Sequence, residues 1–145
     1  MSQLKLVALD EQDLAVVSAH VQDAVMKVGD LSYLAADRRF VAALNRFVWE
    51  GRTGFFGRRN ERRRSALHFE AVRGVRTVGF SRGKPDEVLS LLALRFEPGA
   101  EPPAGVIELT CSGGAAIRLE VDYIEARLAD LGAAWETASR PAHRG

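Results

Sequence analysis

The sequence contains a single cysteine, Cys111, so the chain lacks the pair that an intramolecular disulfide requires. It also has no run of eighteen apolar residues, and we therefore expect no membrane-spanning helix and no membrane partner. The first residues turn acidic after a short apolar run and lack the basic start of a secretory signal. Together these absences favour the cytoplasm, where disulfides are rare.

Motifs of familiar chemistry are missing as well. The three histidines are scattered, and there is no CxxC pair, HExxH or EF-hand loop, so we expect no metal, no cofactor and no nameable catalytic residue. Cys111 is open to two interpretations. It could be a nucleophile near the backbone donors of Gly113 and Gly114, or a core residue. Its place in the apolar alternation after Ile107 and Leu109 favours the core.

Length and composition are those of one globular domain. The chain has 145 residues, of which 47% are hydrophobic and 27% charged. We predict a single domain over residues 1–132 and a disordered tail over 133–145. Arginine outnumbers lysine by seventeen to three, which together with abundant alanine suggests a GC-rich bacterial genome.

Positive charge is concentrated between residues 46 and 64. This segment has seven arginines, no lysine and two acids, so it carries +5 while the rest of the chain carries −4. Guanidinium groups bind phosphate and carboxylate oxygens bidentately, and aromatic rings stack on bases. We therefore predict a loop over residues 52–64, beside the strand end that carries Phe47, with these anion-binding residues: Arg52, Arg58, Arg59, Arg62, Arg63 and Arg64. The predicted stacking residues are Trp49, Phe55 and Phe56. The alternatives are a solvated loop whose arginines pair with acids elsewhere, and a protein docking site.

Hydrophobic spacing predicts a helix near each end of the chain with strands between. Asp10 suits a helix N-cap, and Leu14, Val17 and Val21 follow at helical spacing. His20 near the end of this helix is either a binding residue or, more commonly, a group that satisfies the helix end. A second helix is expected over residues 123–131, before Gly132.

The middle of the chain alternates with the period of strands. We expect a strand over residues 4–9, two strands over 24–50 joined by a turn at 35–38, and a long strand over 65–81 with bends at Gly74 and Gly79. A strand over 88–97 precedes a hairpin over 106–122. The predicted class is α+β: an antiparallel curved sheet or partly closed barrel of six to seven strands with two terminal helices. This order is also the outline of pleckstrin-homology-like barrels.

Two stretches carry a family resemblance: SAHVQDAV at Ser18–Val25, and LNRFVWE at Leu44–Glu50. With their surroundings they resemble the DUF2948 family of small alphaproteobacterial proteins, from about residue 4 to residue 131. The resemblance implies a cytoplasmic protein and brings no catalytic residue with it.

The sequence therefore favours a non-enzymatic binding protein whose arginine-rich segment meets an anionic partner. That partner could be a nucleic acid, a phosphorylated ligand or an acidic protein patch. One alternative is a small-metabolite-binding barrel or small enzyme with a pocket at the barrel mouth, because a curved sheet that is apolar on both faces can enclose a cavity. Another is a structural homodimer that pairs open sheet edges.

Overall fold

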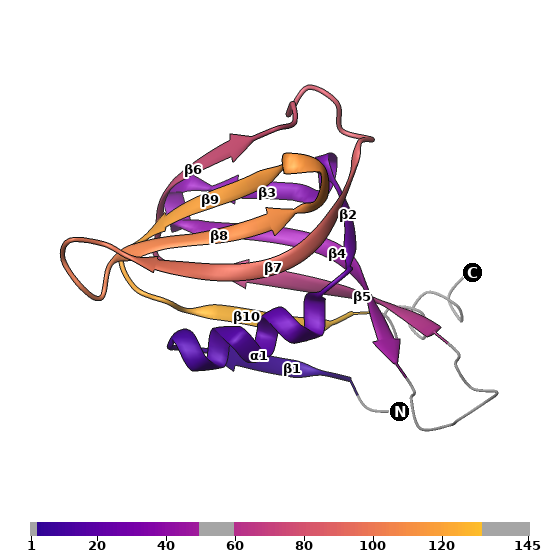
Figure 1. Ribbon diagram of the computed structural model, residues 1–145, viewed down its shortest axis with the longest axis horizontal. Coiled ribbons are helices and arrows are strands. Elements are labelled where there is room, and N and C mark those ends of the chain that lie inside the picture. The colour runs from indigo at the N-terminus through magenta and orange to yellow at the C-terminus, as the bar shows by residue number, and fades with distance from the viewer. Residues whose placement is uncertain (1–2, 50–59, 132–145) are drawn as a thin grey trace.

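A computed structural model describes residues 3–49 and 60–131, which form one α-helix and one long antiparallel sheet (Figure 1). The helix, α1, spans Glu11–Val21, and short 3-10 turns η1 (Val28–Asp30), η2 (Ala35–Asp37) and η4 (Ser112–Gly114) connect strands. The ten strands are β1 (Lys5–Ala8), β2 (Val25–Lys27), β3 (Leu31–Leu34), β4 (Arg39–Trp49), β5 (Asn60–Phe69), β6 (Val72–Val78), β7 (Val88–Pro98), β8 (Gly105–Cys111), β9 (Ala116–Val121) and β10 (Ala126–Asp130).

The sheet runs in the order β1-β10-β5-β4-β2-β7-β8-β9-β6, and β3 pairs with β4 beside this path. It curves strongly but does not close, because β6 and β3 do not pair with each other (Figure 1). Residues with side chains on the inner face alternate with outward ones, as in β8, where every second residue is buried. The inner faces of the strands form one apolar core.

Helix α1 begins where the sequence predicts. The Asp10 carboxylate accepts a hydrogen bond from the Asp13 backbone N–H at 2.8 Å, which caps the first turn. Leu14, Val17 and Val21 are buried and join the core, and the helix packs against β7 and β1 (Figure 1). Among the described residues, no helix is long and apolar enough to cross a membrane.

The predicted C-terminal helix over residues 123–131 is wrong, because this segment contains strand β10. Its buried residues Ile124, Ala126, Leu128 and Asp130 alternate, but their spacing in so short a segment also fits a helix. Pairing with β1 on one side and β5 on the other decides for the strand. The described residues therefore lack the terminal helix on which the pleckstrin-homology outline depended.

The predicted number of strands is too low. Strands β2 and β3 have three and four residues and carry little periodic signal. The long strand predicted over 65–81 divides into β5 and β6 at Ala71, whose backbone takes a left-handed φ of 58°. A register shift between Val72 and Gly74 confirms the predicted bend at Gly74. The hairpin over 106–122 and the turn at 35–38 are confirmed, and the tail predicted over 133–145 lies outside the described residues.

Candidate functional site at the β4–β5 hairpin

The arginine-rich segment lies on the hairpin formed by β4 and β5. The prediction of a loop over residues 52–64 is wrong for its last part, because residues 60–64 belong to β5 and pair with β4. Trp49 is the last residue of β4, and its side chain is outside the described part. The predicted residues that lie outside the described ranges altogether are Arg52, Phe55, Phe56, Arg58 and Arg59.

Strand register divides the described arginines between two faces of the hairpin. Arg46 lies opposite Arg63, in line with the buried pair Leu44 and Ser65, so both arginines face the inside of the sheet. The intervening residues, including Arg62 and Arg64, face outward. The hairpin thus presents cations both to solvent and to the interior.

The outward arginines have local partners. The Arg62 guanidinium lies 5.1 Å from the centroid of the Phe47 ring, a cation–π contact. Arg64 Nη2 donates to Asp30 Oδ2 at 3.2 Å and Nη1 to Asn45 Oδ1 at 3.5 Å, and the Arg64 and Asp30 side chains are 39% and 34% exposed. Exposed ion pairs contribute little stability and exchange readily with other charges. These two arginines therefore remain accessible to an anion that approaches from outside.

The inward arginines converge on Asp130, the last residue of β10. Arg46 donates from Nε to Oδ1 and from Nη2 to Oδ2, both at 2.9 Å, in a bidentate salt bridge. Arg63 Nη1 lies 3.8 Å from Oδ2. The Asp130 side chain is 1% exposed and that of Arg46 is 8% exposed, so this bridge is buried. A buried charge of this kind requires its counterion.

Asp130 is held by further donors. Ser65 Oγ donates to Oδ1 at 2.7 Å, and the Leu4 backbone N–H donates to Oδ2 at 3.0 Å. Burial alone would raise the pKa of Asp130, but the hydrogen bonds from Arg46, Leu4 and Ser65 outweigh it and hold this pKa at about 2. The carboxylate is therefore ionised at neutral pH and fixes the orientation of the Arg46 guanidinium.

This arrangement leaves part of Arg46 unused. The bridge to Asp130 occupies Nε and one N–H of Nη2, and no other hydrogen bond of Arg46 occurs within the described residues. A guanidinium has five N–H donors, so the two of Nη1 and the second of Nη2 remain available. These donors form a fork that matches a carboxylate or phosphate group.

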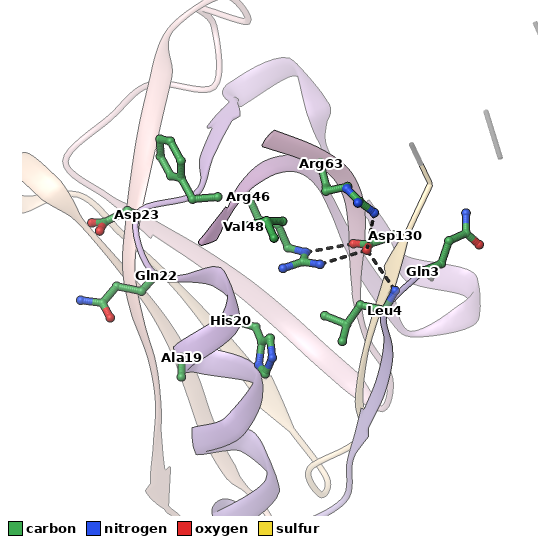
Figure 2. A pocket seen from close by; sticks show the side chains of 11 residues that line it. Gln3, Leu4, Ala19, His20, Gln22, Asp23, Arg46, Val48, Arg63 and Asp130 are labelled. Atoms are coloured by element: carbon green, nitrogen blue, oxygen red, sulfur yellow. Dashed lines mark hydrogen bonds and ion pairs between the residues drawn. The ribbon is translucent and has the colours of Figure 1, made fainter. Parts of the chain in front are cut away.

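The free side of Arg46 borders a cavity of about 700 Å³ between the C-terminal end of α1 and the hairpin. We call it the hairpin cavity. Figure 2 shows Arg46 and Arg63 reaching Asp130, with His20 of α1 facing the same space. Its lining includes Leu4, His20, Asp23, Arg46, Arg63 and Asp130.

His20 supports the helix end as predicted and also lines the hairpin cavity. Its Nδ1 donates to the Val16 carbonyl oxygen at 2.9 Å, because a carbonyl oxygen can only accept. Nε2 is then left for another partner. The helix-end interpretation of this residue is confirmed, and a binding role for it stays a prediction.

The sequence pattern does not identify Arg46 and Asp130 as site residues. Arg46 belongs to the charged segment, but its inward direction depends on the β4 register. Asp130 falls in the segment for which the sequence predicts a helix. The available signal was an aspartate at the buried position of an alternating segment, which requires a cation nearby.

Two other kinds of site among the described residues would be a reactive cysteine and a metal centre. Cys111 is buried, and burial followed by the nearby Glu108 carboxylate raises the pKa of its thiol to about 11, which confirms the core interpretation. No cluster of three or more potential metal ligands occurs in residues 3–49 and 60–131.

A second polar cavity, near the β5–β6 turn, is bordered by salt bridges between Arg39 and Glu70 and between Arg38 and Asp122. His68 also borders it, and burial together with the Arg39 charge lowers the pKa of this histidine. Arg38 and Arg39 each pair with an acid. This cavity therefore has fewer available donors for an anion than the hairpin cavity has.

Comparison with known proteins gives a family and no further relative. A family model described as "Protein of unknown function (DUF2948)" matches residues 4–143. No curated protein and no solved structure matches the chain significantly. The two segments that carry the resemblance both contribute to the hairpin cavity, the first through Ala19, His20, Gln22 and Asp23 and the second through residues 46–48. Because the match covers nearly the whole sequence, the chain belongs to the DUF2948 family.

Proposed function

We propose that this protein is a cytoplasmic binding protein for an oxyanion-bearing small molecule, and that the hairpin cavity is its binding site. The observation that carries the proposal is the buried Arg46, which Asp130 holds in place while its remaining donors have no partner among the described residues. A carboxylate or phosphate group would satisfy these donors. Arg63 supplies a second positive charge at the same wall.

The opposite wall of the hairpin cavity has the opposite polarity. Asp23 and the C-terminal end of α1 lie there, and a helix C-terminus carries partial negative charge. In Figure 2 Asp23 lies on the far side of Arg46 from Asp130. A ligand with an oxyanion at one end and an amine at the other fits this polarity better than a ligand with two anionic ends.

Binding can be tested by isothermal titration calorimetry with inorganic phosphate, succinate and glutamate as probes. We expect at least one probe to bind, and glutamate to bind more tightly than succinate because its amine meets the negative wall. Arg63→Gln should weaken binding by roughly tenfold or more, since hydrogen bonds to charged groups contribute about 1.5–3 kcal/mol. This change leaves the bridge between Arg46 and Asp130 in place.

Arg95→Gln is the matched control, because Arg95 is an exposed arginine of β7 that does not line the hairpin cavity. Its affinity should equal that of the wild type. Equal losses in the Arg63 and Arg95 variants would indicate only a general charge effect, and the absence of binding by all three probes would refute the proposal.

The outer face of the hairpin favours a second candidate, the binding of single-stranded nucleic acid. Exposed Arg62 stacks on Phe47, and the partly exposed Arg64 pairs with Asp30 and Asn45, so both cations can meet phosphates from solvent. Phe47 offers an aromatic ring beside them.

A further inference from the structure

The open seam of the sheet contains a separate cavity. Strands β3 and β6 are not paired, yet one hydrogen bond from β3 and one from the residue after η2 hold the start of β6. Tyr33 Oη donates to the Val72 carbonyl oxygen at 2.8 Å, and the Val72 N–H donates to the Arg38 carbonyl oxygen at 2.9 Å. Between β6 and β3 with η1 lies a cavity of about 200 Å³, which we call the seam cavity.

The walls of the seam cavity are mainly apolar. Leu31 and Tyr33 of β3 lie on one side, and Val75 and Thr77 of β6 on the other. The β6 residues face inward, because their register partners on β9 are buried core residues. The cavity also reaches the core itself, through the buried side chains of Phe40 and Ile117.

This size and lining suit one small ring. An apolar cavity of about 150 Å³ stays dry and binds benzene, because water finds too few polar partners there. The seam cavity is of comparable volume and is also lined by aromatic and branched side chains. It is smaller than the roughly 300–1,000 Å³ of sites for drug-sized ligands, so a larger occupant is excluded unless the seam opens.

Two polar side chains, Arg82 and Thr77, border the otherwise apolar seam cavity. Arg82 lines it from the turn after β6 and makes no ion pair or hydrogen bond with any described residue. Thr77 likewise has no side-chain hydrogen bond in the described part of the chain. An exposed cation beside an apolar cavity complements a ligand with an apolar body and an anionic end.

The turn that carries Arg82 is anchored to the cavity wall. The Gly29 N–H donates to the Pro85 carbonyl oxygen at 2.9 Å, and the Val28 N–H donates to the Glu87 carbonyl oxygen at the same distance. The approach is so close that a Cβ on Gly29 would lie 3.0 Å from the Pro85 Cβ. The turn therefore packs on η1, on the same side of the seam as β3.

We propose that the seam cavity binds a small aryl carboxylate. The ring occupies the space against Phe40 and Ile117, and the carboxylate pairs with Arg82 at the mouth. This site is distinct from the hairpin cavity in its position, its residues and the apolar character of its ligand.

The test uses benzoate as the probe and benzamide as its neutral analogue of similar shape. In ¹H–¹⁵N correlation spectra of the full chain, benzoate should shift the amide signals of Gly29 and Thr77. Titration of these shifts gives the affinity. Benzamide should bind roughly twofold to fivefold more weakly, because it lacks the charge that meets Arg82.

Two variants locate the ligand. Val75→Phe places a ring in the seam cavity and should abolish the benzoate shifts, while Val78→Phe on the same strand is the control because Val78 is outward and exposed. Arg82→Gln should reduce benzoate affinity to that of benzamide. Lys84→Gln removes a charge from the same turn without touching the cavity and should leave affinity unchanged.

The results separate this site from the hairpin cavity. Arg63→Gln should leave the benzoate shifts at Gly29 and Thr77 intact, whatever it does to phosphate or glutamate binding. Benzoate shifts that survive Val75→Phe, a benzoate affinity that Arg82→Gln leaves unchanged, or no shifts at millimolar benzoate, would overturn the proposal. If Val75→Phe does not fold, the exposed Arg82 variant and the benzamide comparison still decide.

Discussion

Among single residues, Asp130 is the one that we expect to contribute most to the stability of the fold. Its carboxylate neutralises Arg46 in the interior and ties β10 to β4, β5 and the chain before β1. Removing one partner of a buried pair leaves the other charge uncompensated, at a cost of about 3–5 kcal/mol. The same pair that positions Arg46 for a ligand is therefore needed for the fold.

We predict that Asp130→Asn lowers the free energy of unfolding by about 3–5 kcal/mol at pH 7, as measured by urea denaturation. Asp122→Asn is the matched control. Asp122 also pairs with two arginines, Arg38 and Arg73, but its side chain is 37% exposed, so its loss should cost less than about 1 kcal/mol. Equal losses in the two variants would contradict the buried role of Asp130.

The pH profile gives an independent signature of Asp130. Its folded pKa of about 2 is below the unfolded value, so its contribution is complete above about pH 4 and is lost as the pH falls towards 2. The depression of the pKa corresponds to roughly 2 kcal/mol. Wild-type stability should therefore fall more steeply between pH 4 and 2 than that of Asp130→Asn, and parallel profiles would refute this account.

At the level of elements, the β4–β5 hairpin sorts its charges by strand period. Two consecutive arginines in β5 necessarily point to opposite faces, so Arg63 faces the hairpin cavity while Arg62 and Arg64 face solvent. A loop would have imposed no such division. The arginine-rich sequence predicts a charged surface, but only the register shows that the segment serves an inner and an outer face.

The outer face can be tested with a fluorescent oligothymidylate and anisotropy. If this face binds single strands, affinity should fall with salt, with a slope in log–log form of about −0.7 per phosphate contact. The double variant Arg62→Ala with Arg64→Ala should make that slope shallower by about 1.4. Arg76→Ala with Arg95→Ala removes two exposed arginines from β6 and β7 as the control. If the salt dependence of affinity does not change in the Arg62 and Arg64 variant, the outer face of the hairpin is not the binding site for the single strand.

Strand β10 shows the limit of reading elements from periodicity. Five residues with alternating burial do not distinguish a strand from a helix when apolar residues also recur at three- and four-residue spacing. The information that decides lies in β1 and β5, far away in the sequence. By contrast, α1 is predictable because its cap and its apolar stripe are both local.

At the scale of the whole molecule, the sequence predicts a curved antiparallel sheet with an N-terminal helix, and the structure confirms this. The hairpin around Ser112-Gly113-Gly114 is predictable because alternation and turn residues coincide. The pairings of β10 with β5 and of β2 with β7 join segments far apart in the sequence, so the positions of the hairpin cavity and the seam cavity do not follow from local patterns. Both cavities lie where distant segments meet.

The seam should be the first part of the sheet to open. Strand β8 pairs on both sides, whereas β6 pairs only with β9 and is held across the seam by the hydrogen bonds of Val72 with Tyr33 and Arg38. Tyr33→Phe removes one of these bonds, which contributes about 1 kcal/mol. We expect β6 amides to exchange with deuterium roughly fivefold faster in this variant, and β8 amides to change less.

The control is Tyr123→Phe, because Tyr123 is exposed and has no side-chain hydrogen bond among the described residues. This variant should leave both exchange rates unchanged. Uniform acceleration of β6 and β8 would mean that the sheet opens only as a whole.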